Sequence, residues 1–203
     1  MRKGRLVRAS PEPFFANVPA FFDLSDTHYY NGLTEKKIGA CLKMEIERKW
    51  LIGGFPAGLP LLKESRVRQG YIATCPVVRI RESVGADGRR CVLCFKGNGT
   101  LAREEIETDI SPELFGQLTA FTGQDLVTKE YKVYALPGGE RLEVSLVDAG
   151  RPTAFYYAEV EFPTVEAARA FVPPPFLGEE KTESGDFSMS AYWRATRDAG
   201  RAE

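Results

Sequence analysis

The chain has 203 residues and a formal net charge of −1, and 43% of its residues are hydrophobic and 27% charged. These values are typical of a globular domain with a core of useful size, and they exclude a disordered chain. The near balance of charge argues against a broad basic surface for a nucleic acid duplex or for acidic lipid. No stretch approaches the ~20 apolar residues of a membrane-spanning helix, and the N-terminus lacks the apolar run of a secretory signal.

The chain contains four cysteines, Cys41, Cys75, Cys91 and Cys94, and one histidine, His28. Cys91 and Cys94 form a C-x-x-C inside a stretch that has the pattern of a β-strand. A spacing of three residues puts two side chains on opposite faces of a strand. Because a zinc site normally needs four such ligands, the sequence favours free thiols in a reducing cytoplasm over a metal or redox centre.

Residues 1–43 differ in texture from the rest of the chain. Basic residues open the segment, and prolines then interrupt two phenylalanine pairs, at positions 14–15 and 21–22. No helical or strand period persists there. We interpret the segment as a poorly ordered extension, or as the result of an upstream start codon with the working protein beginning at Met44. A targeting segment and a partner-binding arm are the alternatives. The folded domain is expected over residues 44–203.

From Met44 the chain changes to alternating, strand-like segments. The first, residues 44–52, places Glu45, Glu47 and Lys49 on one face and mostly apolar residues on the other, because side chains alternate along a strand. Further strands are expected at residues 69–72, 77–81, 91–96 and 103–109. Turn-forming residues at 86–88 and 97–99 separate the last three of these.

A helix is expected after the fifth strand, with Ser111 as its N-cap, Pro112 at its first position and Gly123 at its end. Strands resume at residues 127–134, 140–147 and 156–162. A short helix over residues 164–171 follows, and a final helix starts near residue 188 with a stripe of packing residues that includes Trp193. About eight short strands joined mostly by turns predict an α+β domain built on an antiparallel sheet or a closed barrel.

The polar faces of these strands carry charges that are sorted by sign. Like charges two residues apart recur in several strands, as Arg79 with Arg81 and Glu159 with Glu161. One such strand by itself fits a half-buried surface strand. Several together favour a charged barrel interior, in which the partners of each charge come from other strands. Carboxylates suit Mg²⁺ or Mn²⁺ and arginines suit phosphate oxygens, so the pattern indicates a metal-bound polyphosphate.

These stretches, in this order, resemble the motifs of the CYTH superfamily, the triphosphate tunnel metalloenzymes, over most of residues 44–193. The matches are E-x-E-x-K at Glu45, Glu47 and Lys49, R-x-R at Arg79 and Arg81, K-G at Lys96 and Gly97, R-x-E-x-E at Arg103, Glu105 and Glu107, E-x-E-F at Glu159, Glu161 and Phe162, and G-x-E-x-T at Gly178, Glu180 and Thr182. The resemblance is greatest to the short bacterial inorganic triphosphatases. It implies an eight-stranded antiparallel β-barrel, a tunnel with helices packed outside, that binds a triphosphate compound with Mg²⁺ or Mn²⁺.

The resemblance also implies a role for each matched residue. The triphosphate would contact Arg79, Arg81, Lys96, Arg103 and Lys129. The metal would be held by Glu45, Glu47, Glu105, Glu107, Glu159 and Glu161. Lys49 would act in catalysis together with Tyr71, which follows the Gln-Gly of the second strand. The implied reaction is hydrolysis of inorganic tripolyphosphate to diphosphate and phosphate. Phosphoryl transfer requires mainly positioning and charge neutralisation, which such a tunnel supplies.

One position departs from the family pattern. The sixth strand usually carries K-x-R, whereas this chain has Lys129-Glu130-Tyr131, and the adjacent Lys132 has the wrong strand parity to replace the arginine. An adenylate cyclase, an organic triphosphatase and a non-catalytic polyphosphate-binding module therefore stay as alternatives. A homodimer is one expected assembly state.

Overall fold

The structure is a computed structural model that describes residues 41–198. Its strands are β1 (Cys41–Leu51), β2 (Leu61–Thr74), β3 (Val77–Gly85), β4 (Gly88–Lys96), β5 (Ala102–Asp109), β6 (Val127–Ala135), β7 (Arg141–Val147) and β8 (Phe155–Glu161). Its helices are α1 (Pro112–Thr122), α2 (Val165–Ala170), α3 (Met189–Trp193) and the π-helical turn η1 (Arg194–Asp198) that continues α3. The element order expected from the sequence is confirmed.

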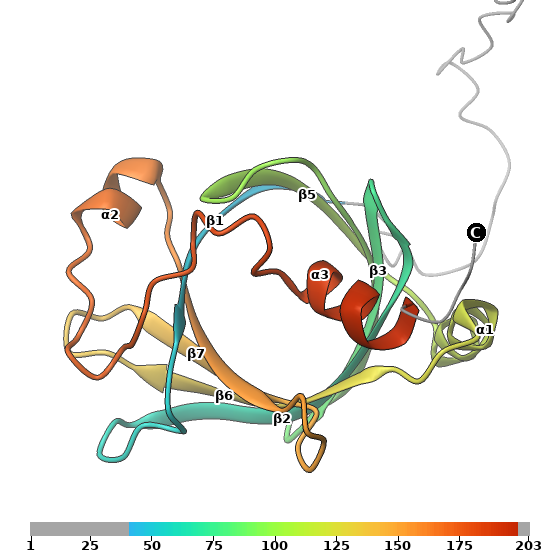
Figure 1. Ribbon diagram of the computed structural model, residues 1–203, viewed down its shortest axis with the longest axis horizontal. Coiled ribbons are helices and arrows are strands. Elements are labelled where there is room, and N and C mark those ends of the chain that lie inside the picture. The colour runs from blue at the N-terminus through green and yellow to red at the C-terminus, as the bar shows by residue number, and fades with distance from the viewer. Residues whose placement is uncertain (1–40, 199–203) are drawn as a thin grey trace, which may run out of the picture. The chain divides into compact units, whose positions relative to one another are not determined.

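The eight strands close into one antiparallel barrel in the order β1-β5-β4-β3-β2-β6-β7-β8 (Figure 1). β1 pairs with β5 through its first half and with β8 through its second half. This register puts Glu45 opposite Arg103 and Lys49 opposite Glu159. The strand that carries the E-x-E-x-K motif therefore joins two other strands that carry charged motifs.

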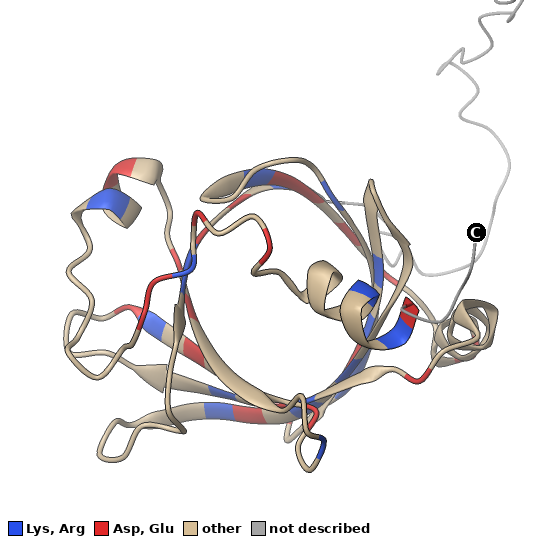
Figure 2. Cartoon of the chain, viewed as in Figure 1, with Lys and Arg blue, Asp and Glu red and all other residues tan. Residues whose placement is uncertain are grey.

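Alternation along the strands directs charge into the barrel and leaves much of the hydrophobic core on its outer wall. Figure 2 shows lysines, arginines and carboxylates along the strands around the opening. Ile46 and Trp50, which alternate with the motif residues on β1, belong to an outer cluster that also contains Ala168 of α2. A second outer cluster joins Ile80 of β3 to Phe115 of α1.

The first helix forms as its sequence predicts. The Ser111 hydroxyl accepts a hydrogen bond from the Leu114 amide at 3.1 Å, and Gly123 adopts the left-handed conformation, with φ of 63°, at the C-terminal end. A side chain would be strained there, which accounts for the glycine. The helix packs on the outer wall through Phe115, as expected for a helix outside a barrel.

The third helix differs from the expectation that the helices pack outside. Trp193 of α3 packs against the inward-facing Tyr71 and Tyr157 and against Val127 and Val147. In Figure 1, α3 lies across the opening of the barrel, whereas α1 and α2 flank it. The reason is the change in composition along the interior, because the inward side chains at this end are aromatic or aliphatic and need a hydrophobic cover.

The folded part begins before the boundary expected at Met44. β1 starts at Cys41, and Lys43 lies opposite Glu105 on β5, with its ammonium 3.0 Å from that carboxylate. Clustering of contacts separates a compact unit, Ile38–Glu203, from Met1–Lys37. The interpretation of residues 1–43 as an extension lies, for residues 1–40, outside the described residues.

Within residues 41–198, no helix is long and apolar enough to cross a membrane. The thiols of Cys75, Cys91 and Cys94 are free, as predicted. Cys91 belongs to the outer cluster under α1, whereas the Cys94 thiol donates a hydrogen bond to Glu105 at 3.1 Å inside the barrel. The two cysteines of the C-x-x-C thus lie on opposite faces of β4.

Candidate active site

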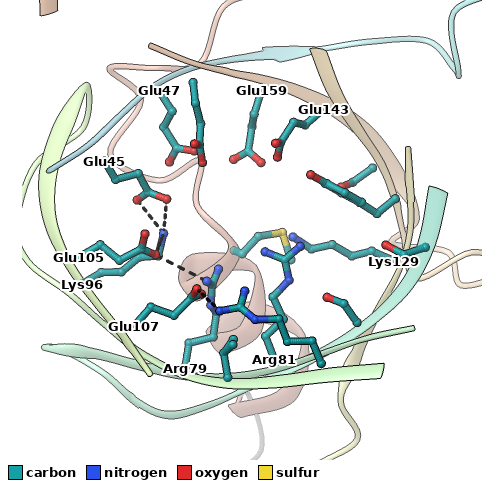
Figure 3. A pocket seen from close by; sticks show the side chains of 18 of the residues that line it. Glu45, Glu47, Arg79, Arg81, Lys96, Glu105, Glu107, Lys129, Glu143 and Glu159 are labelled. Carbon is teal, nitrogen blue, oxygen red and sulfur yellow. Dashed lines mark hydrogen bonds and ion pairs between the residues drawn. The ribbon is translucent and has the colours of Figure 1, made fainter. Parts of the chain in front are cut away.

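The barrel encloses a charged cavity of about 420 Å³. Figure 3 shows Glu45, Glu47, Glu159 and Glu143 along one side, with Arg79, Arg81 and Lys129 across the cavity from them. The carboxylates come from β1, β7 and β8, and the facing bases come from β3 and β6. Acids and bases are therefore separated across the interior, as the sorted strand faces suggest.

The E-x-E-x-K residues form a chain of ion pairs on the acidic side. Glu45 lies 2.6 Å from the Lys96 ammonium and 2.7 Å from Arg103. Glu47 lies 2.7 Å from the Lys49 ammonium and 2.8 Å from Arg103. Lys49 also lies 3.4 Å from Glu159. Because strand neighbours supply these partners, the register of β1 with β5 and β8 creates the cluster.

Burial and neighbouring charge shift the pKa values of these carboxyls in opposite directions. Burial alone would raise the pKa of Glu45, but the Lys96 and Arg103 cations outweigh it and hold the pKa well below its usual range. Burial and the negative charge of Glu159 raise the pKa of Glu47. The crowded carboxylates are thus only partly neutralised by protein cations, and an additional cation would stabilise them.

Glu105 of β5 is the centre of a second set of contacts. Its carboxylate lies 3.0 Å from the Lys96 ammonium, 3.0 Å from Lys43 and 3.8 Å from Arg79. Burial opposes its charge, but Lys96 outweighs burial and lowers the pKa of Glu105 to about 2. Glu105 stays ionised at neutral pH and holds the bases of β3 and β4 in the cavity.

The basic side has donors without partners. The Nε atoms of Arg79 and Arg81 are buried and have no hydrogen-bond acceptor among the described residues. A buried guanidinium N–H without an acceptor is unfavourable, so these groups are suited to an anion that enters the cavity. Arginine forks match phosphate oxygens in particular.

Lys129 completes the basic side with a different environment. Its ammonium donates to the Tyr157 hydroxyl at 2.6 Å and lies 5.1 Å from the centre of that ring. Burial lowers the pKa of Lys129 to about 7. This lysine therefore changes charge near neutral pH unless an anion stabilises its protonated form.

Tyr71 lies on the inward face of β2 at the end of the barrel covered by α3. Its ring is 5.7 Å from that of Trp193, and its side chain lines the cavity together with Lys49. Burial raises the pKa of Tyr71 to about 12, so the phenol keeps its proton at neutral pH. The hydroxyl is thus available as a hydrogen-bond donor.

Two predicted metal ligands lie apart from the central cluster. Glu107 is 3.2 Å from Arg90, and Glu161 is exposed at the end of β8. Both line the same cavity, but they lie nearer the end opposite to α3, since β5 ends at Asp109 and β8 at Glu161. The remaining predicted residues, among them Glu45, Glu47, Glu105 and Glu159, meet in its central part.

Sequence reasoning missed Glu143 and Tyr157, which also line the cavity. Burial, followed by the charge of Glu159, raises the pKa of Glu143 to about 7, and the Tyr131 hydroxyl lies within hydrogen-bonding reach of this carboxyl. The signal in the sequence was the alternation of β7, in which Leu142 and Val144 face outward. Tyr157 shares the strand face of Glu159 and was detectable in the same way.

The departure at Tyr131 is resolved in its geometry. Tyr131 faces the cavity, and the Arg81 guanidinium lies 5.5 Å from the centre of its ring. Lys132 points to the outside, where it lies 4.7 Å from the ring centre of Phe55 and 3.7 Å from Glu64. The parity prediction for Lys132 is confirmed, so this lysine does not replace the missing arginine.

The G-x-E-x-T stretch supports the site from outside. The Gly178 and Lys181 amides donate to the carbonyls of Leu51 and Lys49 at 2.8 Å each, and the Thr182 hydroxyl accepts from the Lys49 amide at 3.0 Å. A Cβ atom at Gly178 would lie 2.8 Å from the Leu51 carbonyl oxygen, which accounts for the glycine. The motif therefore fixes the backbone of the strand that presents Lys49.

A closed antiparallel barrel with carboxylates facing bases across its interior defines the class of triphosphate tunnel enzymes. No protein-family model matches the chain. A curated inorganic triphosphatase of Nitrosomonas europaea is 37% identical over 147 residues, which cover 72% of this chain and 95% of the relative. A crystal structure of an inorganic triphosphatase matches with a TM-score of 0.51 and 33% identity over 73% of this chain and 93% of its own. The crystal structure of a hypothetical protein matches with a TM-score of 0.50 and 32% identity, over 73% and 96%. The chain belongs to the CYTH superfamily of triphosphate tunnel metalloenzymes.

Proposed function

We propose that the protein hydrolyses inorganic tripolyphosphate to diphosphate and phosphate with the help of a divalent cation, Mg²⁺ or Mn²⁺. The observation that carries this proposal is the cavity itself, in which a carboxylate side faces buried arginines that have hydrogen-bond donors without acceptors. The relation to an inorganic triphosphatase at 37% identity supports the same substrate.

The residues present fit a hard divalent cation by their chemistry. Glu45, Glu47 and Glu159 offer carboxylate oxygens, which Mg²⁺ and Mn²⁺ prefer, and the raised pKa of Glu47 reflects a local excess of negative charge. In residues 41–198, no three acidic, cysteine or histidine side chains form a ready-made metal site, because lysines and arginines hold the carboxylates. Metal binding therefore requires the carboxylates to exchange their partners.

This exchange explains the arrangement of charge. Lys96, Arg103 and Lys49 would leave their carboxylates and bind phosphate oxygens, and the freed Glu45 and Glu47 would bind the metal. Each charge would then keep an opposite charge nearby, so the buried interior would not lose its neutralisation. When bound, the metal would neutralise phosphate charge and lower the pKa of water.

The remaining groups would act on the phosphoryl group itself. Arg79, Arg81 and Lys129 would orient the triphosphate, and Lys49 and Tyr71 would donate hydrogen bonds to the phosphoryl group that is transferred. Such donors stabilise charge that develops in the transition state. Water adds to a terminal phosphorus, the bridging P–O bond breaks, and diphosphate and phosphate form.

Release of phosphate from tripolyphosphate tests the proposal, measured with Mg²⁺, with Mn²⁺ and with a chelator. We expect release that depends on the metal. Absence of release by a folded sample would contradict the hydrolase function. Glu47→Gln should lower kcat at least a hundredfold because it removes a carboxylate from the site, whereas Glu166→Gln on the exposed surface of α2 should leave kcat unchanged.

A substrate panel separates the alternatives. ATP, thiamine triphosphate and tripolyphosphate are compared under the same conditions, and we expect the highest kcat/KM for tripolyphosphate. Preference for an organic triphosphate, or formation of a cyclic nucleotide from ATP, would assign another activity of the superfamily. Tight metal-dependent binding without turnover would indicate the binding module.

Two further expectations are part of the proposal. The free thiols support a cytoplasmic location, because oxidising compartments favour disulfides. Assembly as a homodimer stays a prediction, which sedimentation of the purified protein tests.

A further inference from the structure

Gln69 is a buried polar residue for which neither the sequence motifs nor the ion pairs provide a role. It lies on β2, opposite Arg81 of β3 and Val127 of β6, and its exposed fraction is 0%. Burying an amide is unfavourable unless it makes hydrogen bonds. The amide oxygen of Gln69 has no partner among the described residues, so an apolar side chain of similar size would suit this position better if only packing mattered.

The amide nitrogen of Gln69 makes one hydrogen bond. It donates to the hydroxyl oxygen of Tyr71 at 3.0 Å, and the bond is fully buried. The two residues are two positions apart on one strand and therefore share the inward face. The bond thus connects a residue in the barrel wall to a hydroxyl that lines the cavity.

The direction of this bond determines what Tyr71 can do. Because Gln69 donates, it occupies a lone pair of the phenol oxygen, and the phenolic hydrogen must point away from Gln69. Packing of the Tyr71 ring against Trp193 limits the positions of the ring. The hydrogen is then free to face the cavity, where Lys49 and Arg79 also present donors.

We propose that Gln69 is a positioning residue, whose amide orients the Tyr71 hydroxyl so that its hydrogen faces the phosphoryl group being transferred. The inference rests on the proposed triphosphatase function. Gln69 acts through Tyr71 and does not itself touch the substrate.

A double-mutant cycle tests the proposal with tripolyphosphate and Mg²⁺ as the probe. Gln69→Met keeps the length of the side chain and removes the donor. We expect kcat to fall about tenfold with little change in KM in the wild-type background. In the Tyr71→Phe background the same substitution should change kcat less than twofold, because the hydroxyl that Gln69 orients is absent.

Several outcomes would overturn the proposal. Equal losses of kcat in both backgrounds would mean that Gln69 only supports the fold, and a raised KM with unchanged kcat would mean direct contact with substrate. Unchanged kinetics of Gln69→Met beside an active wild-type protein would reject the positioning role alone. An inactive wild-type protein would reject the proposed function and this inference together.

Two further variants keep the test decisive if Gln69→Met folds poorly. Gln69→Glu has almost the same shape but can only accept from Tyr71 when ionised, so it should lower kcat at least as much. Wild-type kcat in Gln69→Glu would overturn the assigned bond direction. Gln117→Met, on the exposed face of α1, is the matched control and should leave both kinetic constants unchanged.

Discussion

Lys129 differs from the other bases of the cavity because its charge depends on pH near neutrality. Burial lowers the pKa of Lys129 to about 7, so the ammonium form is present below this pH and is lost above it. If the lysine binds phosphate, kcat/KM for tripolyphosphate should fall up to tenfold per pH unit above about 7, since kcat/KM reports the free enzyme.

The measurement is the pH profile of kcat/KM for the wild-type protein and two variants. Lys129→Arg stays charged and should move the alkaline limb to higher pH, although the ionisation of the substrate is the same. Lys132→Met, on the outer wall, should leave the profile unchanged. An alkaline limb that stays near pH 7 in Lys129→Arg would refute the assignment.

Tyr131 is the second residue with a specific consequence, since it occupies the position of an arginine in the family pattern. Its hydroxyl lies near Glu143, whose pKa burial and Glu159 raise to about 7. Tyr131→Arg would add a cation beside this carboxyl and opposite the metal-binding side. A charge-assisted hydrogen bond contributes about 1.5–3 kcal/mol, so KM for tripolyphosphate should fall about tenfold or more.

Tyr131→Phe is the matched control for that substitution, because it removes the hydroxyl without adding charge. It should leave KM within about twofold of the wild-type value, since the ring keeps its place near Arg81. A KM that is unchanged in Tyr131→Arg would mean that this position does not reach the substrate.

At the scale of elements, α3 and η1 are held on the barrel by one buried ion pair. Arg197 lies 2.6 Å from Asp148, and the side chains of both are almost fully buried. Asp148 also accepts hydrogen bonds from the Tyr192 hydroxyl at 2.8 Å and from the Thr128 amide at 2.9 Å. The loop before β8 thereby connects the cover of the barrel to β6.

Removal of one partner of this pair should destabilise the protein strongly. Arg197→Met would leave the Asp148 carboxylate buried without its cation, which costs about 3–5 kcal/mol of unfolding free energy. Urea denaturation measures the loss. Adding Asp148→Asn to Arg197→Met should recover part of it, because no uncompensated charge then remains. Equal stability of wild-type and Arg197→Met would contradict this role.

The accuracy of the sequence predictions varied between elements for physical reasons. The inward faces of β1, β3, β5 and β8 were predictable because apolar and charged residues alternate clearly there. β2 was expected only at residues 69–72 but spans Leu61–Thr74. Its first half carries charges on both faces, as Glu64 and Arg66 alternate with Lys63, so it lacks the polar and apolar alternation of a strand with one buried face.

The partners within the site could not be predicted from the sequence. Which base meets Glu45 depends on the strand order, which brings β5 beside β1 although β2, β3 and β4 lie between them in the chain. The packing stripe of α3 was recognised correctly, but amphipathic spacing does not say which surface a helix covers. Only the apolar ring around Tyr71 determines that Trp193 packs at the end of the barrel.

At the scale of the whole molecule, the compact unit Ile38–Glu203 should contain the activity. The relative of Nitrosomonas europaea aligns over 95% of its own length with 72% of this chain, so most of the first 40 residues have no counterpart in it. A fragment that starts at Ile38 should keep the kcat and the melting temperature of the full chain. Loss of activity in this fragment would assign a role to the preceding residues.

A second fragment that starts at Met44 is the matched comparison. It lacks the part of β1 in which Cys41 pairs with Glu107 and Lys43 binds Glu105. Loss of these backbone and ionic contacts should lower the unfolding free energy by about 1–2 kcal/mol, seen as a lower melting temperature. Equal melting temperatures would mean that the first residues of β1 do not support the barrel.

The charge of the cavity also has a consequence for how fast substrate arrives. Its lining contains eleven lysines and arginines and eight carboxylates, whereas the whole chain has a net charge of −1. The positive excess is thus concentrated where a polyanion binds and is absent from the molecule as a whole. Long-range attraction then acts mainly near the opening and is screened by salt, with a Debye length of about 8 Å at physiological ionic strength. The association rate of a triphosphate should therefore depend on ionic strength more steeply than the net charge of the protein suggests.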